Sequence, residues 1–118
     1  YSIDLFNKNN FAISGGNYDK NDKEFMPFYY TNDGGKSFKT LDIQENFFGS
    51  CVKYLNKNEL YVTGHRGTYY INLKKKKVIE LKDKEGNKLN FHTLRISDNK
   101  KKIILAGANG RIASIDLK

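Results

Sequence analysis

The pattern that determines the fold of this chain is the stretch Cys51-Val-Lys-Tyr-Leu-Asn-Lys-Asn-Glu-Leu-Tyr-Val-Thr-Gly64. Two short runs of β-branched and aromatic residues flank the turn Asn56-Lys-Asn-Glu59, and a glycine ends the second run. Such runs, separated by a few turn residues, are typical of a β-hairpin. The stretch therefore predicts two antiparallel strands, over residues 51–55 and 60–64.

This hairpin pattern occurs three times along the chain. Each copy has an apolar run, a turn rich in Asn, Asp or Lys, and a second run that ends in glycine; the other two copies cover residues 2–15 and 92–107. The three glycines, Gly15, Gly64 and Gly107, are 49 and 43 residues apart. A repeat of this kind predicts a fold built from copies of one supersecondary unit.

Further strand-like runs follow each glycine. A third run is present in all three units and a fourth in the first two, over residues 27–32, 67–72, 110–117, 37–43 and 78–81. Apolar residues nowhere keep the spacing of an amphipathic helix for more than about two turns. The prediction is an all-β chain of eleven strands in three antiparallel meanders, the third of which lacks its last strand.

A four-stranded meander that repeats about every 40–50 residues is typical of a β-propeller blade. We expect one partial propeller domain of about 2.75 blades, at residues 2–43, 49–81 and 91–118. Propellers have about four to eight blades, so the chain is either a piece of a longer propeller or a subunit whose copies complete a ring. A β-sandwich is the alternative, but it does not predict three near-copies. The glycine that ends each second strand suits a crowded position or a positive φ.

The most specific motif is the turn after the third strand of the first unit, Thr31-Asn-Asp-Gly-Gly-Lys-Ser-Phe38. It resembles the Asp-box, or BNR repeat, in which Ser or Thr, Asp, Gly, Ser or Thr and an aromatic residue have a set spacing. The Asp can accept backbone N–H bonds of its own turn, the glycines permit left-handed backbone, and the aromatic residue packs on the apolar side. The positions concerned are Thr31, Asp33, Gly34, Gly35, Ser37 and Phe38.

Through this motif the chain resembles Asp-box propellers of the sialidase superfamily, and most of all the photosystem II stability/assembly factor type. The resemblance implies a non-catalytic scaffold that binds another protein, located outside the cytoplasm, with no cofactor. Asp-boxes are structural turns throughout these proteins, so the motif implies a fold and leaves the activity open. A purely structural domain of a larger secreted protein is a further alternative.

Composition argues against several kinds of site. Among 118 residues there are one cysteine, Cys51, and two histidines, which predicts neither an internal disulfide nor a metal site. Cys51 is expected to be a small buried hydrophobe. No apolar run approaches the roughly 20 residues that cross a bilayer. The lysines are not interleaved with an aromatic platform, so specific nucleic-acid binding is not indicated.

A sialidase would need three arginines that hold the carboxylate of the substrate, a Tyr paired with a Glu as the nucleophile, and an Asp as the acid/base. The chain has Arg66, Arg95 and Arg111, but the family's Arg-Ile-Pro motif is absent and no Asp or Glu lies in a comparable loop. We therefore expect no catalytic residue. The longest of the loops that follow a second strand, residues 17–25, shows no catalytic pattern either. Further candidate binding residues lie in the turns after two second strands and are His65, Arg66, Asn109 and Arg111. Arg66 and Arg111 would form the alternative carbohydrate site, and His65 is the best candidate contact of a small-molecule or peptide site on the same face.

The positive charge is unevenly distributed. The net charge is +8, and in a blade the turns after the first and third strands lie on one face while the other connections lie opposite. The first set of turns carries seven of the eight charges, of which Lys74, Lys75, Lys76 and Lys77 supply four. We expect this face to attract an acidic protein segment, an anionic membrane surface or another polyanion. The alternative is that lysines keep turns soluble and protect strand edges.

Overall fold

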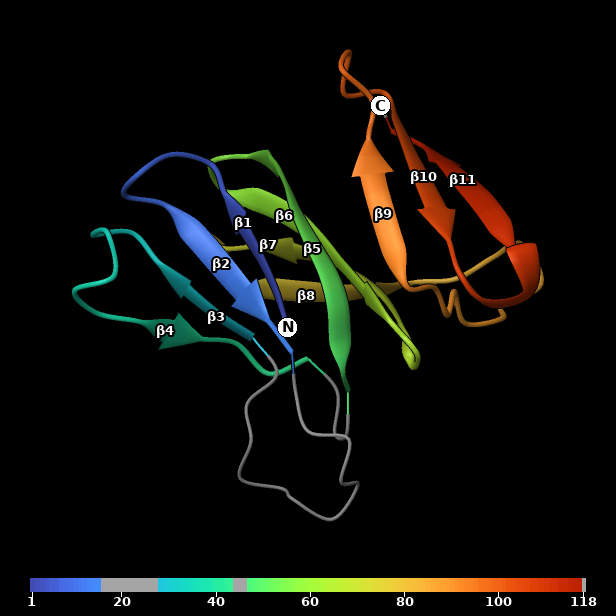
Figure 1. Cartoon of the computed structure of the whole chain (residues 1–118), viewed down its shortest axis with the longest axis horizontal. Coiled ribbons are helices and arrows are strands. Elements are labelled where there is room, and N and C mark those ends of the chain that lie inside the picture. Colours follow the sequence, from blue (N-terminus) through green and yellow to red (C-terminus); the bar gives the residue numbers. More distant parts are fainter. Residues whose placement is uncertain (16–27, 44–46, 118) are drawn as a thin grey trace.

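The computed structural model describes residues 1–15, 28–43 and 47–117, and in them the chain forms three antiparallel sheets (Figure 1). The first sheet has β1 (Ser2–Leu5), β2 (Phe11–Ser14), β3 (Phe28–Thr31) and β4 (Lys39–Thr40), in that order. The second has β5 (Gly49–Asn56), β6 (Glu59–Gly64), β7 (Gly67–Asn72) and β8 (Lys77–Leu81). The third has β9 (Thr93–Ile96), β10 (Lys102–Ala106) and β11 (Ile112–Asp116), with a short 3₁₀ turn at Ala108–Gly110.

The predicted all-β class and the meander order of the strands are confirmed. Two strands are shorter than predicted. Strand β4 covers only Lys39–Thr40, because Ser37 belongs to the preceding turn through its bonds to Asp33. Strand β11 starts at Ile112 because Asn109, with φ 61°, belongs to the 3₁₀ turn before it. Pro27, the predicted start of the third strand, lies outside the described residues.

The turns after the first strands share one chemistry. Asn7 Oδ1 accepts the backbone N–H groups two and three residues further on, at 3.0 and 2.9 Å. Asn56 Oδ1 does the same in the second sheet, at 2.9 Å for both. In the third sheet Ser97 Oγ accepts from Lys101 and Lys102 at 3.3 and 3.1 Å. A short polar side chain that satisfies successive N–H groups stabilises a tight turn, which explains why the repeat retains such residues.

The glycine after each second strand lies against the residue that leads into the first strand of its own sheet. A β-carbon on Gly64 would overlap the Phe48 carbonyl oxygen. None of the three glycines has a positive φ, so crowding explains them and the expectation of a left-handed backbone is wrong. The three pairs are Gly15 with Tyr1, Gly64 with Phe48, and Gly107 with Phe91.

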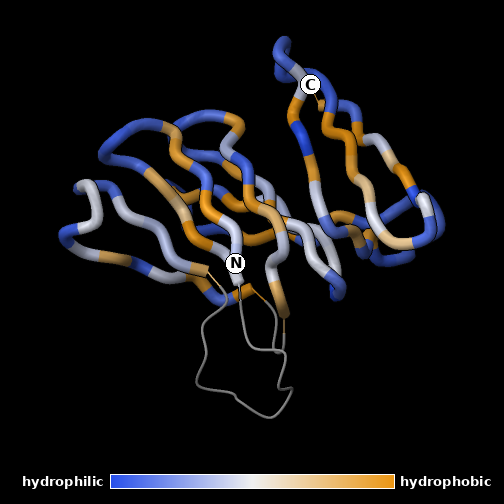
Figure 2. Tube along the Cα trace, viewed as in Figure 1, coloured by the Kyte–Doolittle hydropathy of each residue, from blue (hydrophilic) through white to orange (hydrophobic). Residues whose placement is uncertain are grey.

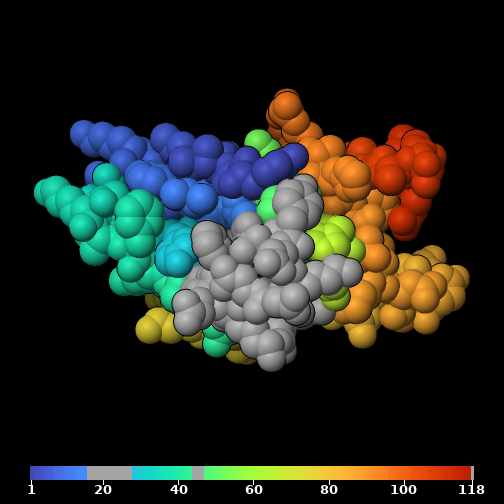
Figure 3. Space-filling model, turned by 60° about the horizontal axis from the view of Figure 1, so that its bottom comes forward, coloured from blue at the N-terminus to red at the C-terminus, as the bar shows by residue number. Residues whose placement is uncertain are grey.

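The first strands of the three sheets are neighbours. Strand β5 lies between β1 and β9 in Figure 1. Asp4 Oδ2 accepts the N–H of Tyr54 at 2.8 Å, and Ser50 Oγ donates to the carbonyl oxygen of His92 at 2.8 Å. The other strands extend away from this central set, and the space-filling view shows the first and third sheets at opposite ends (Figure 3).

The core consists of two clusters, one on each side of the second sheet. Hydrophobic residues follow the strands and hydrophilic ones the turns, as Figure 2 shows. The first cluster joins the first and second sheets and includes Ala12, Phe28, Val52, Leu60 and Ile71. The second joins the second and third sheets and includes Cys51, Tyr61, Leu94, Ile103 and Leu105. Because three sheets are stacked in a row, the two-sheet sandwich does not describe this chain.

Candidate functional site: a basic groove

A cavity of about 490 Å³ opens between the first and second sheets, at the end where the turns after the first and third strands lie. Pockets that hold small ligands span about 300–1,000 Å³. Four lysines line it: Lys39, Lys57, Lys74 and Lys76. Four asparagines line it as well, together with Tyr30 and Leu73: Asn9, Asn10, Asn32 and Asn58. We call this cavity the basic groove.

Backbone hydrogen bonds hold the walls of the basic groove. In the first sheet Gly34 N–H donates to the Asn9 carbonyl at 3.0 Å, and in the second Leu73 N–H donates to the Asn58 carbonyl at 2.8 Å. Each bond ties the turn after a third strand to the turn after a first strand of the same sheet. Leu73 is only 6% exposed, so it anchors its turn in the core beside the groove.

The amides of the groove are partly fixed. Asn10 is buried; its Nδ2 donates to Asn7 Oδ1 at 2.9 Å and its Oδ1 accepts from Asn32 Nδ2 at 3.0 Å. The side chain of Asn58 is exposed and makes no hydrogen bond with the described residues. The groove therefore combines a preorganised amide wall with a free amide that can donate and accept.

The electrostatic character of the groove is positive. No carboxylate is among its lining residues, and none of its four lysines is ion-paired with a described carboxylate. The nearby Glu59 is occupied by the Tyr70 hydroxyl and the Asn56 amide, which lower its pKa and keep it ionised, with a smaller contribution from Lys75. Burial raises the pKa of Tyr30, so its phenol remains a neutral donor.

The structure brings only part of the predicted lysine cluster into this groove. Lys74 and Lys76 line it, whereas Lys75 N–H is bonded to Asn72 Oδ1 at 2.9 Å and Lys77 begins β8. Sequence analysis did not single out Lys39 or Lys57. The available signal was weak: Lys57 occupies the same turn position as Lys8 in the first unit.

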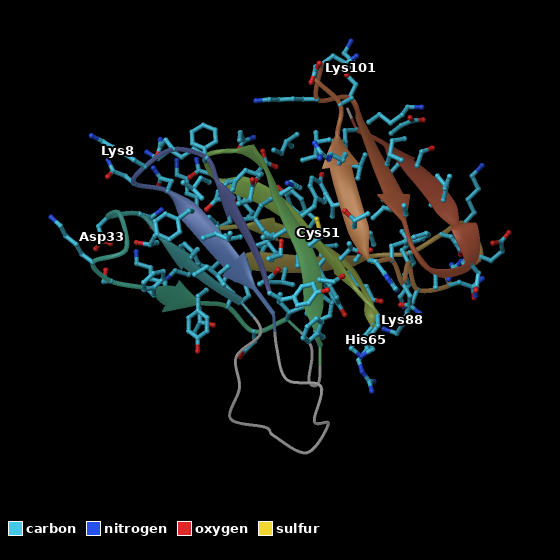
Figure 4. The ribbon with its side chains drawn as sticks, viewed as in Figure 1. Lys8, Asp33, Cys51, His65, Lys88 and Lys101 are labelled. Carbon is cyan, nitrogen blue, oxygen red and sulfur yellow. The ribbon has the colours of Figure 1, made fainter. Side chains whose placement is uncertain are left out.

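The Asp-box-like turn borders the same edge of the first sheet, where Figure 4 shows Asp33 and Lys8 on the side away from His65. Asp33 Oδ1 accepts the Thr31 hydroxyl at 2.7 Å and the Ser37 N–H at 3.0 Å, and Oδ2 accepts the Ser37 hydroxyl at 2.6 Å. Gly34 and Gly35 have φ of 73° and 92°, as predicted. Phe38 remains 46% exposed and meets the Phe11 ring edge-on.

Acid should weaken this turn. The Ser37 hydroxyl, the Ser37 N–H and the Thr31 hydroxyl hold the Asp33 pKa well below its usual range. The stabilisation that ionised Asp33 gives to the folded state is therefore complete above about pH 4, and it is lost as pH falls through the folded-state pKa. We expect Asp33→Asn to lower Tm at neutral pH by the order of a few degrees. It should also reduce the dependence of Tm on pH below about pH 4. Asp98→Asn, in an exposed turn of the third sheet, is the control; equal losses for both variants would contradict the assignment.

The other candidates lie in turns at the opposite side of the sheets. Arg66 follows β6, and its buried Nε has no hydrogen-bond partner. The central carbon of the Arg111 guanidinium lies 5.0 Å from the centroid of the Phe91 ring, so the two groups make a cation–π contact. His65 is exposed with its ring 6.3 Å from Phe48, and Asn109 lies in the 3₁₀ turn. Arg66 and Arg111 are both permanent cations whose side chains can only donate hydrogen bonds, and a carbohydrate site shared between them stays a prediction.

Other kinds of site receive no support within residues 1–15, 28–43 and 47–117. Cys51 is a free, buried thiol, as predicted, with Sγ 3.7 Å from the Leu94 carbonyl oxygen. No group of three or more His, Cys, Asp or Glu in these ranges could hold a metal ion. The described residues contain no helix that is long and apolar enough to cross a membrane. The predicted long loop, 17–25, lies outside the described residues.

Comparison with protein-family models, with curated proteins and with solved structures found no match. The likeness to Asp-box propellers therefore depends on the residues and geometry of this chain.

Proposed function

We propose that the three sheets are blades of a partial Asp-box-type propeller and that the chain is a non-catalytic scaffold whose basic groove binds an acidic segment of a partner protein. The observation that carries the proposal is the basic groove, in which four lysines without described ion-pair partners surround one concave site. By the same resemblance we place the protein outside the cytoplasm.

Three features support the propeller arrangement. The first strands of the sheets are neighbours, as the inner strands of blades are. Each second strand ends in, or is directly followed by, a glycine packed against the entry to its own sheet. Each sheet is also a meander in which a short polar side chain of the turn after the first strand accepts backbone N–H groups. Repeated units that share both packing and turns are typical of repeat folds, to which propellers belong.

The shape of the groove favours an acidic peptide over the other anions considered. A concave site accepts a protruding chain, whereas a flat bilayer surface would meet only its rim. Tyr30, the aromatic residue of the groove, is 3% exposed and offers no stacking surface to a nucleobase. Ammonium groups suit carboxylates, and the Asn58 amide can pair with a peptide backbone.

The test compares two double variants that remove equal charge. We expect Lys57→Gln with Lys74→Gln to weaken binding of a fluorescent glutamate-rich peptide about tenfold or more, because two of the groove's charges disappear. The control, Lys82→Gln with Lys84→Gln, changes exposed lysines after β8 that do not line the groove. Fluorescence anisotropy at two salt concentrations gives Kd, and binding should weaken as salt rises.

Equal weakening by both pairs would show that only the net charge matters and would overturn the groove. Binding to anionic vesicles or heparin, without binding to the glutamate-rich peptide, would overturn the choice of partner. Binding of heparin is therefore measured in the same buffer as binding of the peptide.

A further inference from the structure

The outer face of the first sheet is an apolar surface that neither of the other two described sheets covers. Ile3 and Leu5, on β1, are 54% and 58% exposed, and Tyr29, on β3, is 39% exposed. Phe11 and Ile13 alternate with the buried residues of β2, so they share this face. Clusters of large exposed apolar side chains mark an interaction site.

The pairing register shows that equivalent residues are buried in the other two sheets. Ile3 pairs with Ile13, two residues before Gly15, and Val52 pairs with Val62, two residues before Gly64. In the third sheet the equivalent of Ile3 is Leu94. Val52 and Leu94 are both 0% exposed. Ile3 therefore has an apolar side chain, like its equivalents in the other two sheets, but it is exposed where they are buried.

The chain also shows what covers such a face. Val52 lies under the first sheet, where its N–H donates to Ser2 Oγ at 3.2 Å. Leu94 lies under the second sheet, where Cys51 Sγ donates to its carbonyl oxygen at 3.7 Å. By register, Cys51 is the equivalent of Ser2. Each apolar face is therefore covered by the opposite face of the preceding sheet, with one side chain bonded to the covered backbone.

The outer face of the third sheet is equivalent to the two faces that cover Val52 and Leu94, and none of the described sheets lies against it. Thr93, the equivalent of Ser2 and Cys51, is exposed, and so is Arg95. Ile104 and Ile112 on the same face are 42% and 73% exposed. This face and the apolar face of the first sheet lie at opposite ends of the molecule, as Figure 3 shows for their sheets.

We propose that the outer face of the first sheet binds the outer face of the third sheet of a second copy, head to tail. The contact continues the two sheet–sheet interfaces already present, and it brings Thr93 of one copy to the Ile3 backbone of the other. By register Arg95 is the equivalent of Asp4, whose carboxylate accepts the Tyr54 N–H, and Tyr54 is the equivalent of Leu5, so Arg95 lies beside the Leu5 backbone. A guanidinium can only donate, so its acceptor there is the Leu5 carbonyl oxygen. Two copies supply six sheets, within the four to eight blades of propellers, so two such contacts close a ring.

This inference depends on the propeller arrangement but not on the basic groove, whose peptide binding is measured separately. Light scattering after size-exclusion chromatography should give twice 13.6 kDa for the full chain at high concentration. Ile3→Lys should give the monomer mass, because a charge then lies in the contact. Ile79→Lys is the control, since Ile79 is 49% exposed but lies on β8, away from both faces. Circular dichroism checks that both variants are folded.

The head-to-tail geometry has its own test. Arg95→Glu should also give the monomer mass, and mixing it with Ile3→Lys should restore the dimer, since one contact is then native and the other pairs Glu with Lys. A monomeric wild type at the highest soluble concentration would overturn the proposal, and so would a dimer that Ile3→Lys leaves intact. A dimer sensitive to Ile3→Lys but indifferent to Arg95→Glu would mean that two first sheets meet face to face, which also overturns it.

Discussion

Gly64→Ala should destabilise the protein by about 3 kcal/mol or more. The added β-carbon would overlap the Phe48 carbonyl oxygen, and the Phe47 ring lies 3.3 Å away on the same side. Phe47 and Phe48 are 2% and 5% exposed, so neither can move into solvent without opening the core. A backbone clash in the centre of the stack cannot be relieved by a rotamer change. Urea unfolding followed by circular dichroism measures the loss.

The matched controls are the equivalent glycines of the other two sheets. At Gly107 the added carbon would lie 3.2 Å from the Phe91 ring and 3.3 Å from the Phe91 Cα, so Phe91 must give way by a few tenths of an ångström. At Gly15 the added carbon would have one tight contact, with the Tyr1 backbone nitrogen at 3.2 Å, and its next neighbour, the Tyr1 β-carbon, lies at an ordinary 3.8 Å. We expect losses in the order Gly64, Gly107, Gly15, with Gly15→Ala near neutral because alanine also restricts the unfolded chain. An equal loss at all three positions would contradict this account.

Ile71→Ala should cost about 2–5 kcal/mol. Ile71 is 0% exposed and lies in the cluster between the first and second sheets, where β7 pairs it with Leu60 and Val78. Truncation removes buried methyl groups and leaves a cavity that sheets on both sides prevent from collapsing.

The control for this truncation is the same change at Ile79, which is 49% exposed on β8. Ile79→Ala should change the free energy of unfolding by about 0.5 kcal/mol or less. The two free energies come from urea curves with shared m-values. Similar losses at both positions would show that the sheets are not stacked as described.

Much of the fold is local and was predictable for that reason. The Asn56 turn satisfies its own N–H groups within three residues, and Asn7 repeats this chemistry in the first unit. Strand pairing inside a meander also joins neighbours in the chain, so the order of the strands follows from the turns. The prediction was less accurate at β4, because Ser37 bonds to Asp33 instead of extending the strand.

The candidate site was predictable only in part. Lys74 and Lys76 belong to one lysine run, which the charge pattern revealed. Lys39 comes from the first sheet and Lys57 from another turn of the second, so their convergence depends on how two sheets pack. No local pattern encodes that packing, because the contacts that set it join residues about fifty positions apart, such as Asp4 and Tyr54.

The residue order alone contained the three hairpins, their glycines and the excess of lysine in one set of turns, since each depends on neighbours in the chain or on composition. The stacking of the sheets was needed to decide which lysines face one another, why Gly64 excludes a β-carbon, and why Ile3 is exposed while Val52 is buried. The physical reason is that burial and charge convergence depend on which surfaces meet, and in a stack of small sheets those surfaces belong to distant segments.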